Sequence, residues 1–167
     1  MKETAWNWIE ANRERLIEIS DEIWGYAELG LVETKSAKLL SDELESHGFT
    51  VERGIGGMPT AFYGVWGTGK PVIGVMGEYD ALPGISNKTV PWKEPLKEGA
   101  PGHGCGHNIH GASGLAAAIA LRYALEEHGV QATVNFYGTP AEENYDGKVF
   151  MARTGIFDDV DASLSHH

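Results

Sequence analysis

A chain of 167 residues suits one domain with a buried core, and 42% hydrophobic residues with five tryptophans exclude a disordered protein. Thirteen basic against 24 acidic residues give a net charge of −11, which repels phosphate backbones and anionic membranes, so we expect neither nucleic acid nor a membrane as partner. No apolar run approaches the roughly 18 residues of a membrane-spanning helix, and the start Met1-Lys2-Glu3-Thr4 does not resemble a secretory signal, so we expect a cytoplasmic protein.

The first half of the chain changes from helical to strand-like patterns. Residues 5–24 are predicted to form an amphipathic helix, because apolar residues recur at spacings of three, four or seven in a core-facing stripe of Trp6, Ile9, Leu16, Ile19 and Ile23. A second helix is predicted over residues 35–47, with Gly48 as its C-terminal cap. Short β-branched or aromatic runs then predict strands at residues 49–52, 61–66 and 71–77, and Gly67-Thr68-Gly69 predicts a hairpin turn between the last two.

The second half begins with a long loop and returns to alternating elements. Residues 82–104 contain four prolines and several glycines, which exclude regular structure, and loops of this length border functional sites or are mobile. Small and apolar residues from 110 to 127 predict a buried helix that packs closely on a sheet. A strand is predicted over 132–137, a helix over 145–154 and a short strand over 162–165. The alternation predicts a single α/β domain.

Chemically reactive side chains lie in four short segments, each just after a predicted strand or ahead of a helix, where open α/β sheets bind ligands. These segments are Gly77–Pro83, Gly102–Asn108, Gly138–Glu143 and Ser165–His167. Cys105 and His107 are two residues apart with glycines on either side, so the backbone can bend enough for thiolate and imidazole to face one ion. Glu142 and Glu143 point in different directions, so that one can bind a metal ion while the other reaches a water molecule.

Each of these segments alone also has a structural interpretation. Cys105 and His107 could be a buried thiol beside a surface histidine, paired glutamates a solvated face, and Asp80 an ordinary turn residue. The terminal pair His166-His167 could come from an affinity tag. The coincidence of four segments at comparable positions favours a metal site, and a mixed sulfur, nitrogen and oxygen ligand set suits zinc or manganese.

The order GEYDALPG, GHGCGHN, PAEE and DASLSHH resembles the M20 peptidase family, in its amidohydrolase branch, over essentially the whole chain. The resemblance implies a three-layer α/β catalytic domain with a mixed sheet, of the zinc-peptidase (phosphorylase/hydrolase-like) type. It also implies metal-dependent hydrolysis of amide bonds in N-acyl amino acids or aminobenzoyl-glutamate-like small molecules. The implied cofactor is one or two divalent ions, zinc or manganese.

The resemblance further implies roles for individual residues. The metal ligands would be Cys105, His107, Glu143 and His167. Glu142 would be the general base, and His166 would replace His167 as ligand if the register slips by one. Asp80 falls where the family places an acidic residue near the metal centre, from which it would orient a ligand.

Members of the resembling family are more than twice this length, with an inserted lid domain and a C-terminal segment that supplies a last metal-ligating histidine. We therefore expect residues 1–167 to form the N-terminal portion of a truncated catalytic domain without the lid domain, weak or inactive alone, from a homo-oligomeric parent. Two other hypotheses stay open. In the first, Cys105 is a nucleophile activated by His107 or His110. In the second, the chain is a non-catalytic binding or scaffold module.

Overall fold

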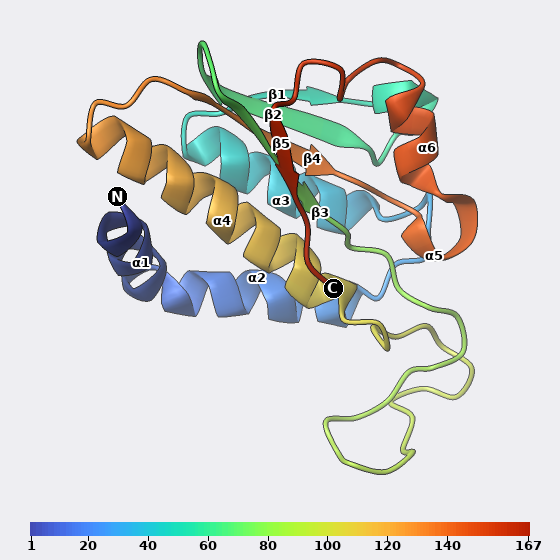
Figure 1. Ribbon diagram of the computed structural model, residues 1–167. Helices are drawn as coiled ribbons and strands as arrows, with labels where there is room; N and C mark the ends of the chain where they lie inside the picture. Colours follow the sequence, from blue (N-terminus) through green and yellow to red (C-terminus); the bar gives the residue numbers. More distant parts are fainter.

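The computed structural model describes all 167 residues, which form an α/β fold around one mixed sheet (Figure 1). The helices are α1 (Lys2–Ala11), α2 (Arg13–Tyr26), α3 (Thr34–Ser46), α4 (His107–Glu127), α5 (Glu142–Tyr145) and α6 (Gly147–Ala152), with a 3-10 turn, η1 (Ile55–Gly57). The strands are β1 (Thr50–Arg53), β2 (Phe62–Gly67), β3 (Val72–Gly77), β4 (Thr133–Gly138) and β5 (Ala162–Leu164). All five predicted strands are confirmed to within a residue or two. None of the helices has both the length and the apolar character needed to cross a bilayer.

The sheet has the strand order β1-β2-β4-β3-β5. Strand β2 runs antiparallel to β1 and β4, whereas β3 runs parallel to both β4 and β5. The predicted hairpin at Gly67-Thr68-Gly69 is therefore wrong, because β4 lies between β2 and β3. Five of the six β4 residues are buried, and a strand that is apolar on both faces is most stable in the centre of a sheet, with both of its edges hydrogen-bonded.

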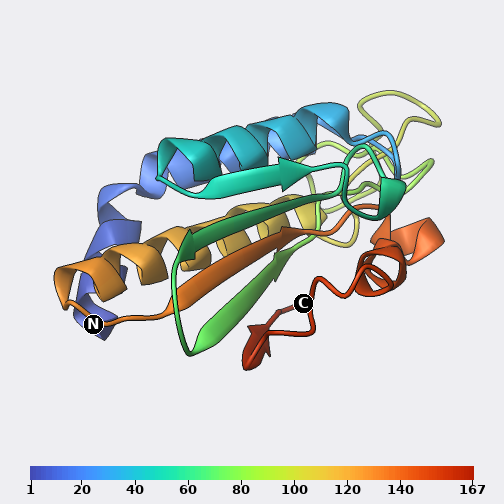
Figure 2. The same ribbon diagram turned by 90° about the horizontal axis from the view of Figure 1, so that it is seen from above.

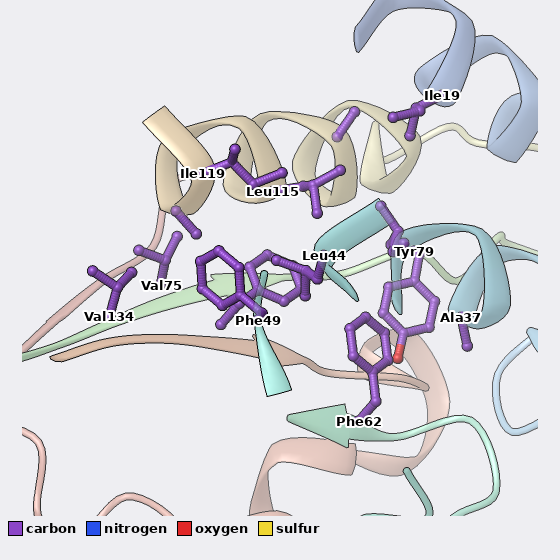
Figure 3. Packing of buried hydrophobic residues seen from close by; sticks show 14 of the residues in the cluster. Ile19, Ala37, Leu44, Phe49, Phe62, Val75, Tyr79, Leu115, Ile119 and Val134 are labelled. Atoms are coloured by element: carbon purple, nitrogen blue, oxygen red, sulfur yellow. The ribbon is translucent and has the colours of Figure 1, made fainter. Parts of the chain in front are cut away.

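Helices α3 and α4 pack on one face of the sheet, and α1 and α2 pack in turn against α4 (Figure 2). Leu115 and Ile119 of α4 point toward Val75 and Val134 of the strands below them (Figure 3). Successive strand residues face opposite sides of a sheet. Thus Phe136 belongs to the larger hydrophobic core on the helix-covered face, while its neighbour Tyr137 belongs to a smaller core on the other face. The second core consists of Ile55, Met58, Ala61, Tyr137 and Met151, beneath η1 and α6. The expected three-layer, mixed-sheet architecture is confirmed.

The predicted first helix is interrupted at Asn12, where the backbone leaves helical geometry (φ −108°, ψ 11°) and the side-chain amide donates to the Trp8 carbonyl oxygen. The apolar stripe does not continue through this break. Trp6 is 61% exposed and was wrongly expected in the core, whereas Ile19 and Ile23 in α2 are fully buried as predicted.

Two other predicted helices differ at their ends. The helix predicted from residue 110 begins at His107, because Gly106, with φ 81°, completes the loop and starts the first turn. The helix predicted over 145–154 is two short helices, α5 and α6, separated by Asp146 in a left-handed conformation (φ 50°). As a result, the glutamates of α5 and the lysine of α6 lie at the end of the sheet where α4 begins.

Glycines let α4 approach β3 closely. A Cβ atom at Gly111 would lie 2.9 Å from the Glu78 carbonyl oxygen, and one at Gly114 would lie 2.6 Å from that of Met76. Any side chain at these two positions would push the helix away from the strand. The prediction of a small-residue helix packed on a sheet is confirmed, and this packing brings the first turn of α4 to the carboxyl end of β3.

Candidate metal centre

The four chemically reactive segments meet at one edge of the sheet. Strands β3, β4 and β5 are parallel, so their carboxyl ends lie together, with Gly77 of β3 paired to Gly138 of β4 and Val75 paired to Leu164 of β5. Helix α4 begins at the same edge, and the C-terminus of the chain lies beside it (Figure 1). The chain connection between β3 and α4 runs through the long loop, which has no helix or strand, as predicted.

His107 occupies the centre of this edge and its side chain is fully buried. Its Nδ1–H donates a 2.8 Å hydrogen bond to Oδ1 of Asp80, which turns Nε2 toward the other acidic residues. Nε2 lies 3.0 Å from Oε2 of Glu78, 3.8 Å from Oε2 of Glu142 and 3.9 Å from Oε1 of Glu143. Glu143 Oε1 is buried without a hydrogen-bond partner, and the carboxylate oxygen nearest to the buried Nε2 of His107 is that of Glu78. A buried imidazole nitrogen that faces several carboxylate oxygens offers a binding position to a cation once its proton is released.

The donor atoms of Cys105, His107 and Glu143 lie within 4.8 Å of one another. A thiolate, an imidazole nitrogen and a carboxylate oxygen form the mixed donor set that zinc and related divalent ions accept. The buried Nε2 of His107 and the unpartnered Oε1 of Glu143 belong to this set. The residues present therefore fit a divalent metal ion.

A second group of donors adjoins the first. Glu78, His107, His110 and His167 also have ligand atoms within 4.8 Å of one another. A neutral imidazole has one free nitrogen, so His107 can serve only one ion. A second ion at this edge would therefore depend on the other three residues.

The two terminal histidines point to different neighbours. His167 Nε2 lies 3.2 Å from Cys105 Sγ, and its ring centroid is 4.6 Å from that of His110. His166 Nε2 lies 3.0 Å from Ser113 Oγ on the exposed side of α4. The structure thus brings His167 and not His166 to the thiol of Cys105.

The carboxylates of the site stabilise positive charge on the groups beside them. Burial opposes charge on His107, but the hydrogen bonds with Asp80 and Glu78 outweigh it and raise the pKa of the imidazole to about 10. Burial also disfavours ionised Glu78, yet contacts with His107 and with the Lys148 ammonium hold the pKa of that carboxyl well below its usual range. A proton on His107 therefore supplies positive charge among these carboxylates, and a metal ion would have to displace it.

Cys105 and His110 titrate differently from His107. Burial and the neighbouring Glu143 carboxylate raise the pKa of the Cys105 thiol to about 11, so the thiol is protonated near neutral pH. Burial lowers the pKa of His110, so its imidazole is neutral and can offer a nitrogen lone pair. Without a cation, Cys105 is not a thiolate nucleophile at neutral pH.

Both oxygens of Asp80 are used as acceptors. Oδ1 receives the Nδ1–H of His107, and Oδ2 receives the backbone N–H of Glu143 at 3.0 Å. One buried carboxylate therefore links the start of α4 to the turn that carries the paired glutamates. This linkage holds the imidazole and the glutamates in a common frame.

Three residues at the site had no predicted role in metal binding. Glu78 lies in the predicted GEYDALPG segment, two residues before Asp80, and this spacing could have indicated that its side chain also faces the site. His110 is a possible activator of Cys105 in the thiol hypothesis, but in the structure it lies one helical turn after His107 and faces Glu78 at 3.1 Å. No local sequence pattern could have indicated Lys148, because it reaches Glu78 from α6, 70 residues further along the chain.

Comparison with known proteins gives one consistent family. Residues 74–167, more than half of the chain, match Peptidase family M20/M25/M40. The chain is 49% identical to one of the subunits of p-aminobenzoyl-glutamate hydrolase from Escherichia coli K12, over 95% of its own length and 33% of that protein. It is 31% identical to mouse Xaa-Arg dipeptidase over 100% of its own length and 38% of that protein. The chain thus spans only about a third of the length of these curated relatives.

Solved structures confirm the fold. A crystal structure of an aminohydrolase from methicillin-resistant Staphylococcus aureus superposes with a TM-score of 0.81 and 26% identity, covering 98% of this chain and 41% of the other. The YXEP protein of Bacillus subtilis, a dinuclear metal-binding peptidase from the M20 family, superposes with a TM-score of 0.74 and 25% identity. That superposition covers 92% of this chain and 42% of YXEP.

Proposed function

The chain belongs to peptidase family M20/M25/M40, and on this basis we propose that the protein hydrolyses amide bonds of small molecules with one or two divalent metal ions. The observation that carries this proposal is the buried Nε2 of His107, which faces three carboxylates, those of Glu78, Glu142 and Glu143, at 3.0, 3.8 and 3.9 Å. Of the two donor groups at this edge, the one formed by Cys105, His107 and Glu143 combines thiol, imidazole and carboxylate donors.

The ligands in this proposal are Cys105, His107, Glu143 and His167. Asp80 orients His107 by accepting a hydrogen bond from its Nδ1–H. When bound, a divalent ion would supply the positive charge that polarises an amide carbonyl and favours deprotonation of water. Its identity is proposed as zinc or manganese, because the donor set mixes sulfur, nitrogen and oxygen.

Glu142 is the general base in this proposal. Its carboxylate is partly exposed and lies 3.8 Å from His107 Nε2, so it can reach both the ligand set and solvent. Oε2 of Glu142 would accept a proton from the attacking water and return it to the leaving amide nitrogen. Asp80 keeps the Nδ1–H of His107 occupied, so that this proton stays on the far side of the ring from the ligands.

The proposed substrates are N-acyl amino acids, among them aminobenzoyl-glutamate. The 49% identity to the p-aminobenzoyl-glutamate hydrolase protein supports this class, and Hippurate hydrolase of Campylobacter jejuni is 34% identical over 81% of the chain. The first of these relatives is one of the subunits of its enzyme, which supports an oligomeric parent for this chain as well. A thiol hydrolase is disfavoured, because burial and Glu143 raise the pKa of Cys105 to about 11.

The decisive test is the metal content of the chain purified without a histidine tag and without added metal, measured by elemental analysis. We expect about one equivalent or more of zinc or manganese, lost in Cys105→Ser and Glu143→Ala. Glu94→Ala removes an exposed loop carboxylate and serves as the matched control that keeps its metal. A folded wild-type chain that takes up no metal even when zinc is supplied, or variants that retain it, would contradict the proposal.

A further inference from the structure

The segment between α2 and α3 braces both loops that carry the metal centre. The carbonyl oxygen of Glu28 accepts the backbone N–H of Ala81, just after Asp80, at 2.8 Å. Five residues later, Oε1 of Glu33 accepts the backbone N–H of Ala141 at 2.7 Å. Leu29 also pairs with Ala81 in a parallel bridge. A short stretch far from the motifs in sequence therefore contacts the residues next to two of them.

Glu33 is a fully buried acid with no basic partner. Its exposed fraction is 0%, and besides Ala141 its carboxylate accepts one side-chain hydrogen bond, 2.9 Å from Thr60 Oγ1 to Oε2. Desolvation raises the pKa of this carboxyl. Burying a carboxylate costs free energy, and this cost is only partly offset when its partners are a hydroxyl and a backbone amide and not a basic side chain.

The bonded partner of Glu33 is in an unfavourable backbone conformation. Ala141 is fully buried and has φ 57° and ψ 39°, the left-handed region that costs a residue with a Cβ about 1–2 kcal/mol. A Cβ atom added to Gly30 would lie 3.0 Å from the Ala141 Cα atom, so the turn also packs tightly against the same segment. This turn decides the direction in which α5 begins, and Glu142 and Glu143 are the first two residues of α5.

Two buried carboxylates therefore hold the backbone on either side of Glu142. Glu33 holds the N–H of Ala141, and Asp80 holds the N–H of Glu143. We propose that Glu33 is a positioning residue of the metal centre, which fixes the left-handed turn at Ala141 and so directs Glu142 and Glu143 toward His107. The role in a metal centre rests on the proposed function, whereas the effect of Glu33 on the turn at Ala141 can be measured on the metal-free chain.

The test compares wild-type chain with Glu33→Ala, Glu33→Gln and Glu43→Ala. Glutamine can still accept the Ala141 N–H through Oε1 and can donate to Thr60, so it should preserve the turn. Glu43→Ala removes another largely buried carboxylate, which pairs with Arg15 on the far side of α3, and is the matched control. Amide hydrogen exchange is followed by NMR on the metal-free proteins, and zinc affinity by competition with a chromophoric chelator.

For Glu33→Ala we expect faster exchange, by about ten-fold or more, at the amides of Ala141 and Glu143, with no change at Val134 and Phe136 in β4. We expect its zinc affinity to fall by about 10- to 100-fold, as is usual when a residue that orients ligands is lost. Glu33→Gln and Glu43→Ala should stay within about three-fold of wild type in both measurements, because their site geometry is kept.

Unchanged exchange at Ala141 and Glu143 in Glu33→Ala would overturn the inference, and so would a uniform acceleration along β4, which indicates general destabilisation. If Glu33→Ala does not fold, Thr60→Val removes one of the two hydrogen bonds and should accelerate exchange at the same two amides to a smaller extent. A wild-type chain that binds no zinc contradicts the proposed function, and the exchange result then decides the positioning role alone.

Discussion

Asp80 Oδ1 and His107 Nδ1 lie 2.8 Å apart, and both side chains are fully buried. The second oxygen of Asp80 accepts the N–H of Glu143, so each carboxylate oxygen of this residue holds a different segment of the site. The pair joins the segment after β3 to α4 and to the turn after β4. It is the contact on which the alignment of the proposed ligands depends.

The Asp80→Asn variant should bind zinc about 10- to 100-fold more weakly than wild type. An asparagine has one acceptor and one donor group, so its amide would oppose either the His107 Nδ1–H or the Glu143 N–H. Competition with a chelator measures the affinity. Asp161→Asn makes the same chemical change at a distant exposed carboxylate, which accepts the Val72 N–H, and should bind zinc as wild type does. Equal affinity of the two variants would show that Asp80 does not orient the ligands.

The adjacent glutamates should separate in their effects. In the full-length protein, Glu142→Gln should retain metal and lose about 10²- to 10⁴-fold in the rate of amide hydrolysis, because the general base is removed while the ligand set is intact. Glu143→Ala should lose metal and activity together. Turnover of an N-acyl amino acid and metal content, measured on the same preparations, check both expectations. Retained activity in Glu142→Gln would remove Glu142 from its proposed role.

The metal-free chain should become less stable as the pH rises above neutrality. The pKa of His107 is raised to about 10 in the folded chain, against about 6.5 when unfolded, so its stabilisation is complete below pH 6.5 and is lost on the way to pH 10. Between pH 6.5 and 8.5 the free energy of unfolding should fall by up to about 1.4 kcal/mol per pH unit. Urea unfolding in the presence of a chelator measures this slope.

The control for this pH dependence is His107→Asn, in which the slope over the same range should largely vanish. The range stops at pH 8.5 because Cys105, with a pKa raised to about 11, contributes a loss of the same sign at higher pH. An equal slope in the variant would assign the pH dependence to other groups.

The close approach of β2 and β4 at the site edge should make Gly138 intolerant of a side chain. A Cβ atom there would overlap the aromatic ring of Phe62, so Gly138→Ala should destabilise the chain by about 1–3 kcal/mol. Gly25 lies inside α2 with nothing within 4 Å of an added Cβ, and Gly25→Ala should stabilise by about 0.5–1 kcal/mol. Thermal or urea unfolding of the two variants gives opposite signs if the packing is as described.

Much of the secondary structure and all four reactive segments could be predicted along the chain, because each depends on residues close in sequence. The period of the apolar residues located α3, α4 and the strands, and the glycines of the GHGCGHN segment predicted the tight bend that brings Cys105 and His107 together ahead of a helix. The same local reasoning failed at Asn12, where a single break turned Trp6 out of the core, and at the turn after β2, whose residues are typical of a hairpin.

The sequence alone therefore determined the elements, the family resemblance and the residue types available for a metal. Only the tertiary structure decided that β4 lies between β2 and β3, that Lys148 pairs with Glu78, and that Glu33 holds the turn before Glu142. The physical reason is that periodicity reports which face of an element is buried, whereas strand neighbours and buried carboxylate partners depend on contacts between residues far apart in the chain. No local pattern distinguishes such a buried acid from a solvated one until the fold brings its partner to it.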